Sequence, residues 1–260
     1  MVDVEASPVI CNGECDGFID VTVTGGTPYN PDGIEESGDE YYIYEWSSGE
    51  VIEDLNNLCP GDYTLTVTDS LGCCEVINQV IIETTPITVI LDNDSFVELD
   101  CFEDCDGIIN VTIDGGTPPY VDLIWVGPNG FVNDPIVSEF EDIEDLCAGV
   151  YTLEGFDSSP VVNNGQEGCF FSYQIEITQP EELIATFESI SPCFDENNGE
   201  ISTTVNGGTV DYIFSWTGPN GFSSSEEDIS GLEIGDYTVV IIDENDCEFI
   251  ETISLSAAEI

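Results

Sequence analysis

The chain has 260 residues, of which 55 are Asp or Glu and none is Lys, Arg or His, so its formal net charge is −55. Its carboxylates therefore cannot pair with basic side chains, and most enzyme mechanisms are excluded because imidazole, ammonium and guanidinium groups are missing. Nucleic acid and membrane insertion are excluded as well, since phosphate binding depends on Lys and Arg and no apolar run approaches the roughly 20 residues of a membrane span.

The sequence repeats one pattern three times, with a period of roughly 90 residues. Each copy opens with a cysteine and a segment in which apolar residues alternate with polar ones, such as Ile19, Val21 and Val23, which predicts a strand with one buried face. Each of these strands ends in a Gly-Gly-Thr turn. Boundaries near Pro86 and Pro180 divide the chain into three expected domains, at residues 1–85, 86–180 and 181–260.

A tryptophan follows each Gly-Gly turn, and a Leu-x-x-Gly-x-Tyr-Thr pattern follows the tryptophan. This pattern is similar to the tyrosine corner of immunoglobulin-like sandwiches, in which the tyrosine hydroxyl bonds to the backbone across a bend. We find no convincing helix, so the predicted fold is all-β, a tandem array of three immunoglobulin-like β-sandwich modules stapled by disulfides. The aromatic residues expected to fill the cores, rather than to bind a ligand, are Trp46, Trp125, Trp216, Tyr63, Tyr151 and Tyr237.

The connections between the copies are short. The last strand of one copy runs through Thr-Thr-Pro-Ile or Thr-Gln-Pro-Glu almost directly into the first strand of the next, which predicts a stiff rod rather than a flexible string of domains. Residues 252–260 resemble the start of a further junction, so we expect the chain to be cut from a longer array.

Eleven cysteines in such a chain predict an oxidising, extracellular compartment. Copy three keeps only Cys193 and Cys247, which predicts that these two are bonded to each other. It also lacks two cysteines at once, with Asn197 and Glu233 in their places, and this joint loss indicates a second, dispensable bridge. By equivalent positions, the predicted disulfides are Cys193–Cys247, Cys11–Cys73, Cys101–Cys169, Cys15–Cys59 and Cys105–Cys147.

Cys74 is left over by this assignment, and it either competes with Cys73 or stays unpaired. A zinc site at the Cys-x-x-x-Cys segments is the alternative to the bridges, but the absence of His disfavours it.

The predicted bridges would gather acidic loops at one end of each sandwich. Several hard oxygen ligands with no basic neighbour suit calcium, although the spacing does not match an EF-hand, and diffuse condensation of cations on the acidic surface is the alternative. Calcium is therefore a possible cofactor and no cofactor is required. The candidate ligands are Glu14, Asp16, Asp69, Asp104, Asp106, Asp157, Asp195 and Asp243.

Taken together, Cys-x-x-x-Cys-Asp-Gly, a strand, Gly-Gly-Thr-Pro, Trp, Leu-Cys-x-Gly-x-Tyr-Thr and Asp-x-x-Gly-Cys are similar to the SprB-type repeat. Residues 11–73 carry the pattern most fully, and copy three departs from it at Asn197 and Glu233. The resemblance implies large cell-surface adhesins of Bacteroidetes, exported by the type IX secretion system, whose namesake drives gliding motility.

We therefore expect a non-enzymatic, extracellular segment of a large cell-surface adhesin or filament. The expected partners are neighbouring repeats of the same chain, with surface polysaccharide or another cell-surface protein as further candidates. Two alternatives stay open. One is a carbohydrate- or receptor-binding module acting through the inserts at residues 30–41 and 158–168, and the other is a self-assembling surface filament subunit.

Overall fold

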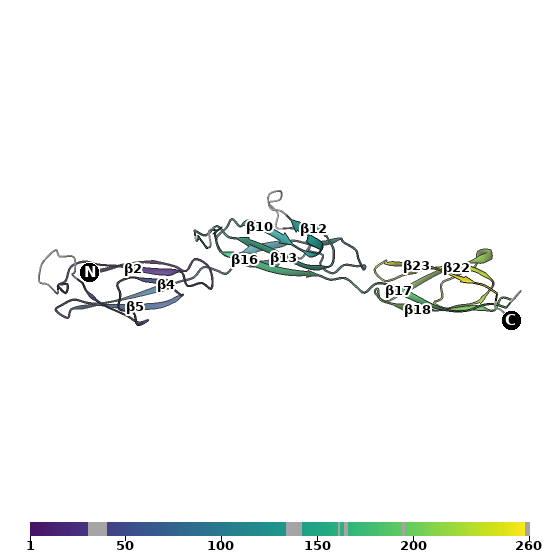
Figure 1. The fold of residues 1–260 in the computed structure, drawn as a ribbon, viewed down its shortest axis with the longest axis horizontal. Coiled ribbons are helices and arrows are strands. Elements are labelled where there is room, and N and C mark those ends of the chain that lie inside the picture. The colour runs from purple at the N-terminus through teal and green to yellow at the C-terminus, as the bar shows by residue number, and fades with distance from the viewer. Residues whose placement is uncertain (31–40, 134–141, 161, 164–165, 194–195, 258–260) are drawn as a thin grey trace.

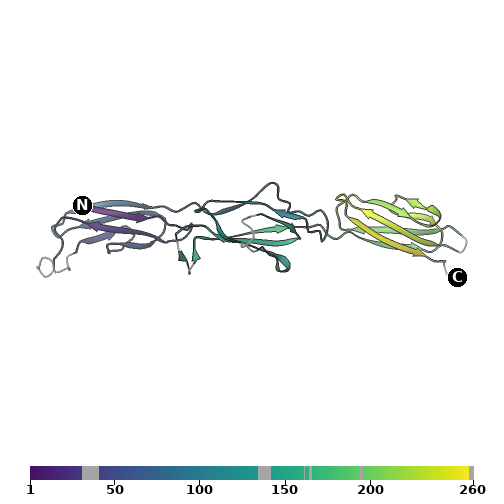
Figure 2. The same cartoon turned by 90° about the horizontal axis from the view of Figure 1, so that it is seen from above.

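The computed structural model describes residues 1–257 except 31–40, 134–141, 161, 164–165 and 194–195. Three β-sandwich modules follow one another in a row, with the two termini at opposite ends of an elongated molecule (Figure 1). The same arrangement is seen after a quarter turn about the long axis (Figure 2), so the molecule is narrow in both directions. Each module has its own hydrophobic core, and the residues of the three cores come from residues 2–81, 87–177 and 185–255.

Module 3 shows the complete strand pattern. Its seven strands are β17 (Ile184–Ile190), β18 (Gly199–Asn206), β19 (Ile213–Thr217), β20 (Ser223–Ser224), β21 (Ile229–Leu232), β22 (Gly235–Ile242) and β23 (Glu248–Leu255). They form one sheet in the order β17-β18-β21 and a second in the order β20-β19-β22-β23. All of the pairings between these strands are antiparallel.

Module 1 has the same two layers, with one strand fewer among its described residues. Its strands are β1 (Val2–Ser7), β2 (Gly17–Val23), β3 (Ile43–Trp46), β4 (Leu55–Leu58), β5 (Gly61–Thr68) and β6 (Cys74–Ile81). The sheets are ordered β1-β2-β4 and β3-β5-β6. In β2 the residues Ile19 and Val21 are buried while Asp20 and Thr22 are exposed, as the alternation in the sequence predicts.

Module 2 divides the first sheet into two pieces, β7-β9 and β12-β8, while the second is ordered β11-β10-β13-β16. The division occurs at Asn110, whose backbone N–H donates to Ser95 Oγ at 3.0 Å instead of continuing the ladder. The strands are β7 (Thr88–Leu91), β8 (Gly107–Ile109), β9 (Val111–Asp114), β10 (Val121–Val126), β11 (Val132–Asn133), β12 (Ile143–Leu146), β13 (Gly149–Phe156), β14 (Val162–Asn163), β15 (Gln166–Glu167) and β16 (Phe170–Ile177). β14 and β15 form a separate hairpin.

The predicted all-β, immunoglobulin-like architecture is confirmed. The described helices are two single turns of 3-10 helix, η1 (Pro128–Gly130) and η2 (Pro219–Gly221). No helix among the described residues is both long enough and apolar enough to span a membrane.

The tryptophans lie in the cores as predicted. Trp46, Trp125 and Trp216 are at most 5% exposed, each on the strand that pairs with the tyrosine strand. Burying such a large ring in each module removes much apolar surface from water, which is the main driving force for folding a small sandwich.

The tyrosine corner is present in all three modules. The hydroxyls of Tyr63, Tyr151 and Tyr237 each donate to the backbone carbonyl four residues earlier, at 3.0, 3.0 and 3.1 Å. Phe131 and Phe222 stack edge-on against the tyrosines of modules 2 and 3, whereas Tyr63 has no aromatic partner among the described residues and is only half-buried. Burial raises the pKa of Tyr151 and of Tyr237, although the bond to the backbone carbonyl opposes the shift.

Candidate functional site

The junctions between modules bring together several kinds of specific contact. At each junction, one module contributes the loop that follows its first strand, and the next module contributes the loop before its last strand together with its Gly-Gly-Thr turn. The connecting peptide passes between them. Disulfides, buried carboxylates and close backbone contacts meet there, so we take the junctions as the candidate functional site.

A buried aspartate organises the side of the junction that belongs to the following module. In module 2, Asp157 is 1% exposed, and one carboxylate oxygen accepts the N–H of Cys169 at 2.8 Å while the other accepts the N–H of Thr117 at 2.8 Å. The Ser159 hydroxyl donates to the first oxygen as well, at 2.6 Å. One side chain thus holds together the cysteine loop and the Gly-Gly-Thr turn.

Modules 1 and 3 have an equivalent buried aspartate. In module 3, Asp243 is 2% exposed and accepts the N–H of Cys247 at 2.9 Å and that of Thr209 at 2.8 Å. In module 1, Asp69 accepts the N–H of Cys73 at 2.8 Å. These three carboxylates are the buried charged groups of the described chain.

The hydrogen bonds also decide the protonation state of these groups. Burial of the Asp157 carboxylate raises its pKa, but the bonds from Cys169, Ser159 and Thr117 outweigh this effect, and the pKa lies below its ordinary value. The bond from the Cys73 amide is the main cause of the lowered pKa of Asp69. Both aspartates are therefore ionised at neutral pH.

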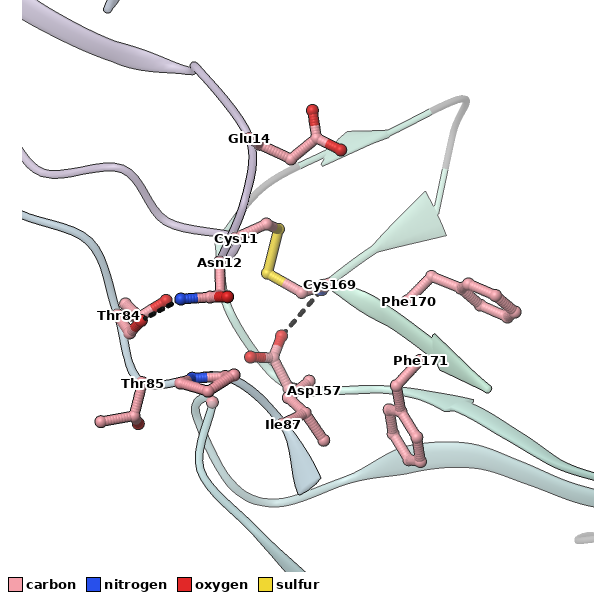
Figure 3. A pocket seen from close by; sticks show the side chains of 12 residues that line it. Cys11, Asn12, Glu14, Thr84, Thr85, Ile87, Asp157, Cys169, Phe170 and Phe171 are labelled. Atoms are coloured by element: carbon pink, nitrogen blue, oxygen red, sulfur yellow. Dashed lines mark hydrogen bonds between the residues drawn. A yellow bond between two sulfur atoms is a disulfide. The ribbon is translucent and has the colours of Figure 1, made fainter. Parts of the chain in front are cut away.

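Disulfides join neighbouring modules across the junctions. Cys11 of module 1 is bonded to Cys169 of module 2 with the two Cα atoms 5.4 Å apart (Figure 3), and Cys101 of module 2 is bonded to Cys247 of module 3 with the Cα atoms 5.6 Å apart. The predicted pairs Cys11–Cys73, Cys101–Cys169 and Cys193–Cys247 are therefore wrong.

The strand directions explain why the pairs within modules cannot form. Cys11 follows β1 at the end of module 1 that faces module 2, where Val9 pairs with Glu83 in a parallel bridge. Cys73 lies at the opposite end, because the eight residues of β6 separate it from that junction. Eight strand residues span about 27 Å, whereas bonded cysteines have Cα atoms about 4.4–6.8 Å apart. The late cysteine of a module therefore faces the preceding module.

The second class of bridge is confirmed. Cys15–Cys59 and Cys105–Cys147 close loops within modules 1 and 2. Cys74 is unpaired, as one of the two predicted outcomes has it, and Cys73 and Cys193 are also free and exposed.

The connecting peptide at the first junction is fixed to module 1. The Thr84 hydroxyl donates to the carbonyl of Ile10 at 2.6 Å, and the Asn12 side-chain amide donates to the carbonyl of Thr84 at 2.9 Å. The N–H of Val9 donates to the carbonyl of Ile82 at 2.8 Å. Hydrogen bonds to module 1 therefore hold the peptide between modules 1 and 2, in addition to the Cys11–Cys169 disulfide.

The Gly-Gly turn of module 2 holds the other end of the same peptide. The N–H of Gly116 donates to the carbonyl of Thr85 at 3.1 Å, and a Cβ atom on Gly115 would collide with the carbonyl oxygen of Pro86. The second junction repeats this arrangement, since a Cβ atom on Gly207 would collide with the carbonyl oxygen of Glu182. Glycine is required at these positions both for its positive φ and for this close approach.

A cavity lies in each junction. The first, of about 320 Å³, has both bonded cysteines and Asp157 in its wall, together with the connecting peptide (Figure 3). The second, of about 480 Å³, has Cys101 and Cys247 in its wall. Acidic residues from both modules face this second cavity, namely Glu103, Asp104, Glu181, Glu182, Asp246 and Glu248.

The structure does not assemble the predicted calcium ligands. Among the described residues, no three Asp, Glu or Cys side chains gather closely enough to hold a metal ion. The oxygens of Asp69, Asp157 and Asp243 are already occupied by N–H donors, as described above. Asp16 Oδ1 accepts the N–H of Ile10 at 3.0 Å, and Glu14, Asp104 and Asp106 are exposed or partly exposed side chains in loops. Asp195 lies outside the described residues.

The acidic coat has almost no internal counter-charge. Within the described part of the chain, the single ion pair joins the N-terminal ammonium group of Met1 to Glu75, with N and O 3.6 Å apart. Both groups are well exposed, so this pair contributes little to stability.

Comparison with known proteins bears on the repeat itself. The model of the SprB repeat matches residues 4–29, 93–121 and 191–221. One segment of each module is thus similar to the SprB repeat. Each matched segment includes the opening cysteine loop, the strand that follows it and the Gly-Gly turn, so each contributes to a junction. Among curated proteins, none matches the sequence.

The solved structures with a similar arrangement are chains of immunoglobulin domains. Titin domains I67–I69, in an E-to-A mutated variant, are 13% identical over 99% of both chains, with a TM-score of 0.33. The eight N-terminal immunoglobulin domains of the Down syndrome cell adhesion molecule are 11% identical over 84% of this chain and 33% of theirs, with a TM-score of 0.39. Sidekick-1 immunoglobulin domains 1–5 are 13% identical over 96% of this chain and 56% of theirs, with a TM-score of 0.29.

Proposed function

We propose that this chain is a segment of an extracellular rod in an adhesin-type surface protein, and that its task is to hold distant parts of that protein apart under tension. The observation that carries the proposal is the pair of disulfides between modules, Cys11–Cys169 and Cys101–Cys247. Bonds in these places do little for the core of any one module. Their effect is to fix each module to the next.

The bridges also create a short covalent path along the whole rod. The path starts at Val2, follows the chain to Cys11 and crosses the disulfide to Cys169. At its other end it crosses from Cys101 to Cys247 and follows β23 to Leu255. Between these crossings the Cys105–Cys147 bridge removes most of module 2 from the path. The path consists of residues 2–11, 147–169, 101–105 and 247–255.

This path limits how far the rod can be stretched. It contains about 45 residues, which reach about 150 Å at a full extension of about 3.4 Å per residue. Without disulfides, about 250 residues could be drawn out to roughly 850 Å. An ordinary chain of immunoglobulin-like domains lengthens when a domain unfolds, whereas this one cannot extend beyond the reach of its bridged path even if every module unfolds.

The test is to pull single molecules by their two ends. The oxidised chain should break its attachment before its end-to-end length passes about 170 Å, which is the path with its three bridges included. After reduction with dithiothreitol the same chain should show three unfolding steps and a final length near 850 Å. An oxidised chain that extends beyond about 300 Å would contradict the proposal.

The placement at a bacterial surface rests on the three segments that are similar to the SprB repeat. We propose a gliding-type adhesin exported by the type IX system as the parent protein, with the rod displaying other regions away from the cell. Antibodies against module 3 that label intact cells, and lose this labelling in a secretion mutant, would support this placement. Labelling only after lysis would contradict it.

A further inference from the structure

Module 2 has a much longer loop before its late cysteine than the other two modules have. Three residues separate Asp69 from Cys73 in module 1, and three separate Asp243 from Cys247 in module 3. In module 2, eleven residues separate the buried aspartate from Cys169, which is eight more. These additional residues lie within residues 147–169, which belong to the bridged path along the rod.

The two ends of this loop are bonded to each other in the folded protein (Figure 3). The N–H of Asp157 donates to the carbonyl of Cys169 at 3.1 Å, and the N–H of Cys169 donates to Asp157 Oδ1 at 2.8 Å. The same oxygen accepts the N–H and the hydroxyl of Ser159, at 3.0 and 2.6 Å. The loop therefore adds no length to the folded rod, because the chain leaves β13 and enters β16 at the same place.

Most of the remaining path is straight strand. In module 1 the path follows β1, and in module 3 it follows β23 from Cys247 to Leu255. In module 2 it follows β13 from the loop to Gly149, at the other end of the module. A β-strand rises about 3.3 Å per residue, which is close to the greatest extension of a peptide. These segments therefore cannot lengthen appreciably under tension.

The loop is thus the main part of the path that can lengthen. Twelve peptide units from Asp157 to Cys169 reach about 41 Å at a full extension of about 3.4 Å per residue. In a hydrogen-bonded antiparallel pair the two Cα atoms are about 5.5 Å apart. Opening the loop therefore lengthens the path by about 35 Å.

Noncovalent contacts keep the loop closed at low tension. The junction bridge at Cys169 pulls the start of β16 toward module 1, and the internal bridge at Cys147 pulls the start of β13 toward module 3. β13 and β16 are antiparallel and paired along eight residues, so tension acts along the strands and must break the whole ladder before either strand can slide. Beyond the ladder, the N–H of Thr178 donates to the carbonyl of Val97 at 2.9 Å, which ties the end of β16 to the segment before Cys101.

We propose that the chain between Asp157 and Cys169 is a reserve loop, which is closed in the folded rod and opens when tension separates β16 from β13. After it opens, the covalent path bears the load. The inference rests on the proposed function, since a chain that never bears tension would not use the loop. It adds that the extension of the bridged rod is concentrated at one place in module 2 instead of being shared among the three modules.

The test changes the length of this loop. In the short variant, residues 158–168 are replaced by Ser-Leu-Gly, the sequence that separates Asp69 from Cys73. In the long variant, eight Gly and Ser residues are inserted between residues 164 and 165. The control carries the same insertion between Asn129 and Gly130, in an exposed turn of module 2 outside the path. The parent chain and all variants carry C73S, C74S and C193S, so that the four disulfides remain and no free thiol can exchange with them.

Single oxidised molecules are pulled by their two ends, and the measured quantity is the length gained between the folded rod and the taut path. We expect this gain to be about 27 Å smaller in the short variant and about 27 Å larger in the long variant than in the parent chain, because eight residues reach about 27 Å. The control insertion should leave the gain unchanged, since the Cys105–Cys147 bridge removes that turn from the path. If the short variant does not fold, the long variant and its control still give the comparison.

The outcomes separate this inference from the proposed function. Equal gains in the parent and long variants, or an equal increase from the control insertion, would overturn the reserve loop even with the parent chain still limited to about 170 Å. An oxidised parent chain that extends beyond about 300 Å would overturn the proposed function, and the reserve loop with it.

Discussion

The disulfides between modules and those within modules differ in whether other contacts can take over their role. Module 3 lacks the internal bridge, with Asn197 and Glu233 at the two cysteine positions. The carbonyl of Glu233 still accepts the Tyr237 hydroxyl, and its side chain accepts the Asn220 amide at 2.6 Å. The corner of the sandwich is thus held by other contacts, so the internal bridge is an addition to packing.

The junctions have no comparable packing that could take over the role of their disulfides. The three hydrophobic cores are separate, and the contacts between modules are hydrogen bonds along a short connecting peptide and across acidic surfaces. The positions that form the junction bridge are cysteines in all three copies, whereas those of the internal bridge are cysteines in two. We therefore expect the junction bond to set the shape of the array and the internal bond to adjust the stability of one module.

Removing both junction bridges should have the largest effect. In the variant C11S/C169S/C101S/C247S, the shortest covalent path lengthens from about 45 to about 170 residues, so the maximal extension rises to about 600 Å. Small-angle scattering should also show a broader distribution of lengths, because adjacent modules can then bend about the connecting peptide. The melting temperature of each module should change little.

The matched control removes the internal bridges instead. In C15S/C59S/C105S/C147S the path still crosses both junction bridges, but it lengthens from about 45 to about 90 residues, or roughly 300 Å. The rod should keep its narrow length distribution while modules 1 and 2 lose stability. If the two variants gave the same scattering profile, the proposed division of tasks between the bridges would be wrong.

Removing one internal bridge should lower the stability of its own module alone. The Cys15–Cys59 bridge closes a loop across 44 positions, and C15S/C59S should cost module 1 about 2–4 kcal/mol. The corresponding fall in melting temperature is about 10 °C or more for a module of this size. Calorimetry should show one of three transitions shifted, and a shift of the module 3 transition would contradict the independence of the cores.

The sequence predicts the contents of each module well, because those contents are local. The alternation in β2 and the Leu-x-x-Gly-x-Tyr pattern before Tyr63 depend on neighbouring residues, and both are found where expected. The internal bridge Cys15–Cys59 was also predictable, since its two cysteines are lost together in copy three.

The junctions could not be predicted in the same way, because they depend on the direction of whole strands. Comparing copies shows which cysteines persist but not which neighbour they face, and Cys193 with Cys247 in one copy suggests a bond within that copy. Assigning Cys11 to Cys169 requires knowing that β1 ends, and β6 begins, at opposite ends of the module. The equal spacing of Asp69 to Cys73 and of Asp243 to Cys247 is the sequence signal for this loop, and the two carboxylates accept backbone N–H groups there rather than binding the predicted calcium.

Replacing the buried aspartate of a junction should have an intermediate effect. In D157N the amide group would place a donor against the N–H of Thr117, and the loss should be about 1–3 kcal/mol for module 2. The exposed Asp114 gives a control, since D114N leaves this network unchanged. Chemical denaturation of both variants measures the difference.

The pH dependence of that difference follows from the lowered pKa of Asp157. A carboxyl group whose pKa is lower in the folded state stabilises the fold fully above its unfolded pKa of about 3.9, and this contribution is lost as pH falls through the folded value. The gap between the wild type and D157N should therefore be constant from pH 7 to about 5 and close below about 4. A gap that persists at pH 2 would mean that packing, and not charge, explains the loss.

The smallest expected effect concerns the ions around the junctions. Acidic residues from modules 2 and 3 face each other at the second junction, and no basic side chain of the chain can screen them. Added salt should thus raise the melting temperature by a few degrees and flatten above about 0.3 M, where the Debye length falls to about 6 Å. The variant without junction bridges should respond more, because its modules are free to move apart at low salt. Calcium at the same ionic strength should act like magnesium if cations only condense on the surface, whereas saturable stabilisation by calcium alone would require a site formed by residues that move together.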